Sequence, residues 1–283
     1  RRCKRVYRQC QSNEIPELLN RNKRWWKFGY FATGSLTVKT KGGKFRLPSH
    51  NPFPGGKDMK KTLYTLCVDN YAPEITEITF PLLKHYADKI RADFYIITER
   101  KWPDWPPVYE KMQIYELSQE HKNDWNIYID ADAMIHPDMF DVTTQVPKDT
   151  VAFNGKDFAN IRWKYDKYFM RDGRNIGACN WFAIASDWCV DLWHPLDIPF
   201  EEAVDNIYAT VNEINTVVVK EHLIDDYTLS RNIARYGLKH MELRSIYTAL
   251  GTNDFRFVWH QYTWPVEQKV VEMRKVLQHW DIH

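Results

Sequence analysis

Apolar and polar residues alternate along the second part of the chain in blocks that predict strands separated by helices. The run Thr62–Val68 is typical of a buried strand, Ile75–Ala87 has apolar residues at helical spacing, and Phe94–Thr98 is a second strand. A proline-containing loop then leads to a helix from about Tyr109 to Glu120 and to the apolar strand Trp125–Ile129. Strands that alternate with helices predict an α/β fold with a mostly parallel sheet flanked by helices.

The remaining elements follow a less regular pattern. We expect two more strands, at Thr150–Asn154 and Trp181–Ala185, and a loop around Arg171–Asn180 between them. Helical periodicity returns near Glu201–Val217, Tyr227–Tyr236 and Val266–His279.

Composition supports a globular protein of 283 residues. Hydrophobic residues make up 44% and charged residues 27%, which allows a large core and excludes global disorder. No apolar run approaches the roughly 18 residues that a membrane span needs. The five cysteines form no CxxC pair, so we expect no thiol chemistry and a reducing, cytoplasmic location. A trimmed N-terminal anchor is the alternative for a chain that starts at Arg1.

Charge divides the chain into two parts. Residues 1–58 carry 14 Lys and Arg against three acids, whereas residues 59–283 carry more acids than bases. The turn-rich stretch Pro52–Gly56 lies close to this change, so we predict a basic, aromatic-rich N-terminal extension (1–58) and a main domain (59–283).

The extension contains one predicted hairpin and one unusual segment. Leu36–Thr40 and Lys44–Leu47 flank a Gly-Gly turn, and the stretch around Trp25 and Trp26 interleaves aromatic rings with cations. Such a pattern can bind an anionic partner such as nucleic acid. The alternative is a solvated basic arm whose rings pack on the main domain.

Two acidic residues end the strand Trp125–Ile129. Side chains two residues apart in an extended chain point the same way, so Asp130 and Asp132 converge at the carboxyl end of a buried strand. Open α/β sheets bind their ligands at that edge. Two carboxylates there suit Mg²⁺ or Mn²⁺, with coordination sites left for the diphosphate of a substrate. Alternatively, both residues simply cap a turn or a helix.

At this point the sequence resembles the nucleotide-sugar-dependent glycosyltransferases of the GT-A fold, over roughly residues 59–265. Their DxD motif follows a strand as Asp130 and Asp132 do here, and the end of their first strand holds the nucleoside, which corresponds to Asp69 and Asn70. In the group that resembles glycogenin and bacterial galactosyltransferases, a basic residue opens the preceding helix, a position that Lys111 matches.

Further short motifs extend the resemblance to that group. Asn175-Ile176-Gly177 looks like its NxG stretch, and Asp225-Asp226-Tyr227-Thr228-Leu229 aligns with its DQxxL, with Asp in place of Gln. A late histidine completes the metal site in that group, and His260, followed by Trp264, resembles it. The usual Gly and Lys-Pro-Trp of that last motif are absent.

The segment that contains Asp225 and Asp226 also resembles the EDxxLxxRxxxxG motif of inverting family-2-like enzymes, in which the second acid is the general base. The two alignments imply opposite stereochemistry, and the Asp in place of Gln favours Asp226 as the base.

Structural roles compete with several of these assignments. Asp225 and Asp226 could be N-cap and first-turn acids of a helix, and His260 a packed core histidine. Lys111 is either a contact of the donor diphosphate or a surface lysine of its helix. The tryptophans in 102–105 and 181–193 could line a sugar site or simply fill the core.

Together these features predict a metal-dependent glycosyltransferase. It would move a sugar from a nucleoside-diphosphate donor to the hydroxyl of a glycan or another acceptor, with Mn²⁺ or Mg²⁺ held by Asp130, Asp132 and His260. The alternatives are a haloacid-dehalogenase-like phosphatase, in which DxD ends the first strand, and a nucleic-acid-binding module. A glycosyltransferase directed to DNA would combine two of these functions.

Overall fold

The computed structural model describes residues 37–40, 43–46, 59–154, 180–207, 219–261 and 264–282. The chain divides into two compact units, Arg1–Gly56 and Lys57–His283. In the first unit, β1 (Thr37–Thr40) and β2 (Gly43–Arg46) pair antiparallel, which confirms the predicted hairpin. The anionic partner proposed for this unit stays a prediction.

The second unit is built on a six-stranded sheet in the order β4-β3-β5-β8-β7-β9. Its strands are β3 (Lys61–Leu66), β4 (Asp93–Ile97), β5 (Trp125–Ile129), β7 (Thr150–Phe153), β8 (Phe182–Ser186) and β9 (Lys239–Glu242). Pairing is parallel for β3 with β4 and with β5, and for β7 with β9, whereas β8 runs antiparallel to both of its neighbours. The predicted α/β class with a mostly parallel sheet is confirmed, and it is consistent with a GT-A-like fold.

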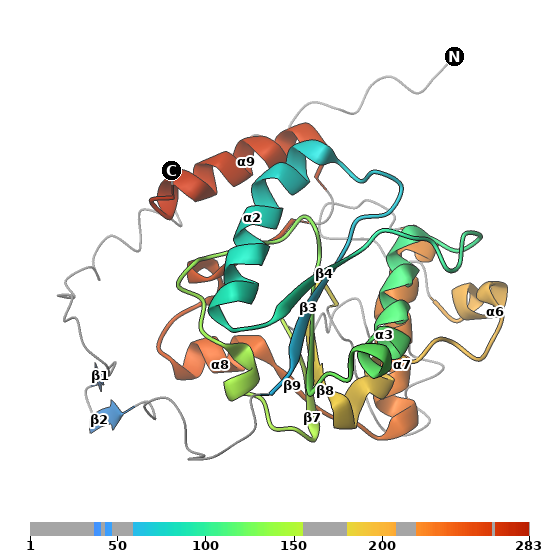
Figure 1. The fold of residues 1–283 in the computed structure, drawn as a ribbon, viewed down its shortest axis with the longest axis horizontal. Helices are drawn as coiled ribbons and strands as arrows, with labels where there is room; N and C mark the ends of the chain where they lie inside the picture. Colours follow the sequence, from blue (N-terminus) through green and yellow to red (C-terminus); the bar gives the residue numbers. More distant parts are fainter. Residues whose placement is uncertain are drawn as a thin grey trace. The chain divides into compact units, whose positions relative to one another are not determined.

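Helices cover both faces of this sheet (Figure 1). They are α2 (Pro73–Lys89), α3 (Ile114–His121), α6 (Phe200–Asp205), α7 (Ile224–Tyr236), α8 (Leu243–Ala249) and α9 (Val266–His279). Helices α2 and α8 lie on one face and α3 and α7 on the other, while α9 runs beside α2. None of the helices in the described part of the chain is long and apolar enough to cross a membrane.

Alternating side chains of the central strands form two cores. Tyr128 of β5 and Ala183 of β8 contribute to the core under α3 and α7, whereas Ile127 of β5 and Ile184 of β8 contribute to the core under α2 and α8. All four are at most 1% exposed. Because successive residues of a strand point to opposite faces, a continuous apolar run such as Trp125–Ile129 serves both cores.

Several predicted boundaries change. The helix expected from Tyr109 starts as a 3₁₀ helix, η2 (Pro107–Gln113), and becomes α-helical only at α3. Helix α6 covers the start of the predicted helix Glu201–Val217, and residues 208–218 lie outside the described residues, as does most of the predicted loop 171–180. The sequence patterns missed β9 and α8, which are short and depend on pairing with β7 and packing on the sheet.

Candidate active site and metal centre

The two acidic residues lie at the carboxyl end of the central strand β5. The antiparallel ladder with β8 continues one residue past the strand, because the backbone N–H of Asp130 donates to the carbonyl of Trp181 at 2.8 Å. The following residue, Ala131, accepts a 2.6 Å hydrogen bond at its backbone carbonyl from the buried Thr79 hydroxyl of α2. The turn that carries both carboxylates is therefore fixed from the sheet on one side and from a helix on the other.

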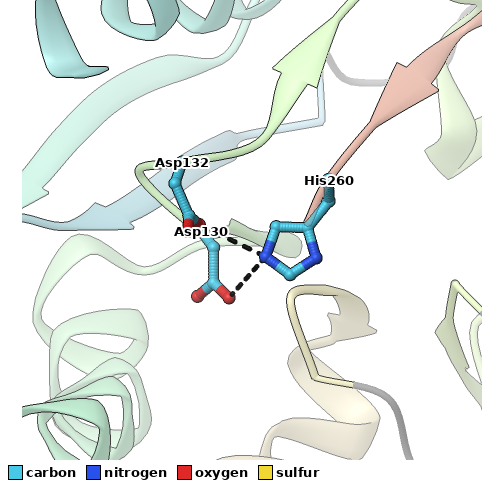
Figure 2. A group of neighbouring side chains, drawn as sticks. All are labelled: Asp130, Asp132 and His260. Carbon is cyan, nitrogen blue, oxygen red and sulfur yellow. Dashed lines mark ion pairs between the residues drawn. The ribbon is translucent and has the colours of Figure 1, made fainter. Parts of the chain in front are cut away.

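A two-stranded ribbon brings a histidine to this turn. Strands β6 (Met134–Ile135) and β10 (Val258–Trp259) pair antiparallel, so His260 follows β10 at the point where Asp132 precedes β6. Its Nε2 lies 3.3 Å from Asp132 Oδ1 and 3.8 Å from Asp130 Oδ2 (Figure 2). The ring also stacks on Trp181, with centroids 4.8 Å apart.

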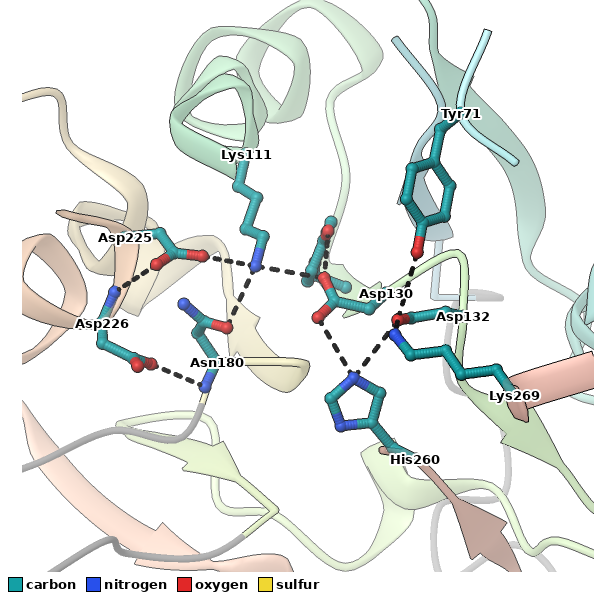
Figure 3. Close-up of polar contacts among 10 residues, drawn as sticks. Tyr71, Lys111, Asp130, Asp132, Asn180, Asp225, Asp226, His260 and Lys269 are labelled. Atoms are coloured by element: carbon teal, nitrogen blue, oxygen red, sulfur yellow. Dashed lines mark hydrogen bonds and ion pairs between the residues drawn. The ribbon is translucent and has the colours of Figure 1, made fainter. Parts of the chain in front are cut away.

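Each carboxylate presents one oxygen to His260 and gives the other to donors of the chain (Figure 3). Asp130 Oδ1 accepts from the Tyr128 hydroxyl at 2.6 Å and pairs with Lys111 Nζ at 3.1 Å. Asp132 Oδ2 accepts from the Tyr71 hydroxyl at 3.2 Å and from the Lys269 ammonium. The outer oxygens, Asp130 Oδ1 and Asp132 Oδ2, are held by these donors and orient both carboxylates. The inner oxygens, Asp130 Oδ2 and Asp132 Oδ1, face the imidazole nitrogen of His260.

Neighbouring charges keep Asp132 and Lys111 ionised. Burial alone would raise the pKa of Asp132, but the adjacent His260 and the Lys269 ammonium outweigh it and hold that pKa below its usual range. Burial would lower the pKa of Lys111, but Asp130 and Asp225 raise it above its usual value. For Tyr71, burial followed by the charge of Asp132 raises the pKa, so its hydroxyl stays a donor.

The three inner atoms fit a divalent cation. For bonds of about 2.1 Å, neighbouring ligand atoms lie about 3.0 Å apart in an octahedral site and about 3.4 Å apart in a tetrahedral one. The separations at His260 are 3.3 and 3.8 Å, and all three ligand atoms lie within 4.8 Å of one another, so the side chains would move closer together to share one ion. Among the described residues, Asp130, Asp132 and His260 form the one group of acids, histidines or cysteines close enough to share an ion.

Lys111 connects the metal candidates to the acids of α7. It is 2% exposed, and its ammonium contacts Asp225 Oδ2 at 2.6 Å, Asp130 Oδ1 at 3.1 Å and Asn180 Oδ1 at 3.0 Å. A lysine ammonium has three donors, so these acceptors use all of them. The alternative of a surface lysine is wrong, and a diphosphate would have to displace one of these partners to bind here.

The two acids of α7 lie side by side but have different surroundings (Figure 3). Asp225 is buried, with Oδ2 on Lys111 and Oδ1 accepting the backbone N–H of Asp226 at 2.8 Å. The half-buried Asp226 accepts the backbone N–H of Asn180 at 3.3 Å. Both lie in the first turn of α7, and the N-cap is Leu223, so the predicted first-turn position is confirmed and the N-cap position is wrong.

Asp69 and Asn70 follow β3 in an exposed loop. Both have φ of 54°, in the left-handed region that Asp and Asn adopt more easily than most residues. The Asp69 carboxylate accepts from Arg100 Nη1 at 2.7 Å, and Arg100 also donates to the fully buried Glu110 at 3.0 Å. The same loop sends Tyr71 to Asp132, so it reaches the acidic pair through the tyrosine rather than through Asp69.

Other predicted positions separate into three cases. Asn175 and Gly177 lie outside the described residues. Trp102 and Trp105 are half-buried and pack edge-on and tilted against the buried Tyr109 of the core, with centroids 5.1 and 4.1 Å away. Trp181 is the tryptophan that contacts a metal candidate, His260.

Sequence reasoning missed the lysine that contacts Asp132. Lys269 is 4% exposed and lies one helical turn before the buried Met273 of α9. A lysine on the apolar face of an amphipathic helix was the available signal, because such a position needs a buried anion as a partner. The hydroxyl of Tyr71 had no comparable signal.

Comparisons with known proteins add little to this description. No protein-family model and no curated protein matches the chain. Among solved structures, that of a glycosyltransferase involved in the glycosylation of the major capsid of PBCV-1 matches 76% of this chain and 99% of its own, with 11% identity and a TM-score of 0.43. That likeness is too low to carry a functional argument, so the proposal below depends on the side chains of the site.

Proposed function

We propose that this protein is a metal-dependent glycosyltransferase that moves a sugar from a nucleoside-diphosphate donor to an acceptor hydroxyl. The observation that carries the proposal is the convergence of Asp130 Oδ2, Asp132 Oδ1 and His260 Nε2 at the carboxyl end of a central strand. Open α/β sheets bind ligands at that edge, and three protein ligands leave coordination positions for a substrate.

The ligand set favours Mn²⁺ over Mg²⁺. Two carboxylates suit either ion, but an imidazole nitrogen fits poorly with the all-oxygen preference of Mg²⁺. A bound ion would neutralise the charge that develops on the departing diphosphate. The contribution of the chain is to hold the Asp132 carboxylate ionised and to orient both carboxylates through Lys111, Lys269 and two tyrosine hydroxyls.

Of the two acids on α7, we assign Asp226 the role of general base. Both oxygens of Asp225 are engaged, one with Lys111 and one with the backbone of Asp226, so Asp225 positions Lys111 and the helix start. The carboxylate of Asp226 is less buried and would accept the proton of the acceptor hydroxyl. This assignment implies an inverting reaction.

The remaining contacts with the donor follow from the resemblance to GT-A enzymes. Asp69 and Asn70, in the loop after β3, would hold the nucleoside, and Asn175 with Gly177 would belong to the wall of the donor and acceptor site. The acceptor is a glycan or another hydroxyl compound, and residues 1–58 are the candidate for an anionic partner.

A screen of nucleotide sugars tests the proposal. The purified chain is incubated with each donor and Mn²⁺, Mg²⁺ or no metal, and release of nucleoside diphosphate is measured together with thermal stabilisation. We expect one donor class to be turned over only with metal. His260→Gln and Asp132→Asn should lose about 100-fold or more in rate, whereas Asp88→Asn, at an exposed position of α2, should not change it.

Two outcomes would contradict the proposal. Turnover that is the same in the two site variants as in the unchanged chain would show that the acidic pair takes no part in the reaction. Release of inorganic phosphate from simple phosphomonoesters, with no nucleotide sugar consumed, would favour the phosphatase alternative.

A further inference from the structure

The least expected charge at the site comes from the C-terminal helix. Lys269 of α9 is 4% exposed, and its ammonium contacts Asp132 Oδ2, the oxygen that faces away from His260. An ammonium is seldom buried so far unless an anion compensates it. The pair joins residues 137 positions apart in the sequence.

The position of Lys269 is fixed by the docking of α9 and not by the site alone. One turn further along, Met273 is fully buried in a cluster with Ile75 and Leu82 of α2 and Met134 of β6. Residues four apart lie on the same face of a helix, so the face that packs on α2 also carries the lysine. The docking of α9 therefore places the ammonium next to Asp132.

Lys269 and Lys111 already neutralise most of the buried charge. The network contains three carboxylates, of the buried Asp132 and Asp225 and the half-buried Asp130, and two buried ammonium groups. Only one negative charge remains uncompensated among them. A divalent cation is attracted more weakly by such a set than by the same carboxylates without the lysines, because each ammonium repels it across a few ångströms of low-dielectric interior.

We propose that Lys269 is a resident counter-cation of the metal centre, which stabilises Asp132 when no ion is bound and lowers the affinity of the site for a free divalent ion. The inference rests on the proposed function, because it takes Asp130, Asp132 and His260 as the metal ligands. Its consequence is that the ion is held firmly only together with an anionic ligand such as a nucleoside diphosphate, which supplies the missing negative charge.

Replacing Lys269 changes the Mn²⁺ affinity in opposite directions for a counter-cation and for a residue that only orients the carboxylate. If Lys269 mainly orients the carboxylate, its removal weakens metal binding. If it acts as a counter-cation, its removal leaves a buried carboxylate without its charge partner, and a divalent ion then gains more by binding. We therefore expect Lys269→Met, which keeps the length and the apolar stem, to bind Mn²⁺ at least about tenfold more tightly than the unchanged chain.

The experiment measures Mn²⁺ binding to the full chain by electron paramagnetic resonance of the free ion, with thermal unfolding followed in parallel. Lys269→Arg keeps the charge and should bind Mn²⁺ within about threefold of the unchanged chain, and so should Lys275→Met, an exposed position on the same helix. Without metal, Lys269→Met should unfold at a lower temperature, and Mn²⁺ should restore more of its stability than it adds to the unchanged chain.

Each outcome gives a decision. Unchanged or weaker Mn²⁺ binding by Lys269→Met, while the unchanged chain binds Mn²⁺, overturns the counter-cation role and leaves the metal site intact. If Lys269→Met does not fold, Lys269→Gln, which keeps a donor for Asp132, replaces it under the same criterion. Failure of the unchanged chain and of all variants to bind Mn²⁺, alone or with a nucleoside diphosphate, overturns the metal centre itself and with it this inference.

Discussion

Replacing Lys111 by methionine removes one positive charge from the centre of a buried network. Methionine has a similar length, so little packing is lost, but Asp225, which is 3% exposed, keeps its negative charge without its partner. Removing one member of a buried ion pair costs about 3–5 kcal/mol. For a domain of this size, each kcal/mol lowers the melting temperature by about 2–4 °C, so we expect a decrease of about 6–20 °C.

Urea unfolding followed by circular dichroism measures this free energy by linear extrapolation. Lys101→Met is the matched control, because Lys101 pairs with Glu116 on the surface, where its side chain is 40% exposed, and should cost less than about 1 kcal/mol. Lys111→Met combined with Asp225→Asn removes both charges and should recover at least about 1 kcal/mol. A loss in Lys111→Met no greater than that in the control would refute the reasoning.

Three further predictions concern other parts of the second unit. Ala72, which precedes α2 with φ of 30°, is strained, so Ala72→Gly should raise the free energy of unfolding by about 0.5–1 kcal/mol in urea titrations; a decrease would contradict this. Glu110 is fully buried and accepts hydrogen bonds from Arg100, Gln113 and two backbone N–H groups. Glu110→Gln should therefore lower the free energy of unfolding by about 3 kcal/mol, seen in calorimetry as a lower melting temperature. An unchanged melting temperature would show that the charge of Glu110 does not contribute to stability. Burial raises the pKa of Tyr86 and Tyr128 well above 10.0, so stability is complete below pH 10.0 and falls as the pH rises from there towards the folded-state values. Absorbance at 295 nm should then show these two rings ionising together with unfolding, and ionisation in the folded protein near pH 10.0 would contradict their burial.

The strongly periodic segments could be predicted from the sequence. Val266–His279 is helical over the expected range, and the apolar run Trp125–Ile129 forms the central strand. In both segments the spacing of apolar residues follows directly from the faces that the helix or strand buries. The direction of β8 could not be predicted, since an apolar strand has the same pattern in a parallel and an antiparallel ladder. The ribbon of β6 and β10 was missed because two-residue strands have no period of their own.

The candidate site could be predicted only in part. Asp130 and Asp132 are close in sequence, so the geometry of a strand already places them together, and the structure brings His260 to them. The partners of the lysines could not be assigned in the same way, because the apolar helix face that carries Lys269 indicates burial but does not identify the carboxylate that the ammonium meets. Their positions depend on packing between segments that are 19 to 137 residues apart.

The contact between α9 and the acidic turn also has a consequence for how the molecule opens. Closing a loop of 137 residues costs about 4 kcal/mol of chain entropy, which the burial of Met273 and its neighbours must offset. Because α9 packs on α2 and β6 and contributes no strand to the six-stranded sheet, it is a natural unit of partial unfolding. Native-state hydrogen exchange should then find the amides of α9 less protected than those of β5, and every detachment of α9 would separate Lys269 from Asp132.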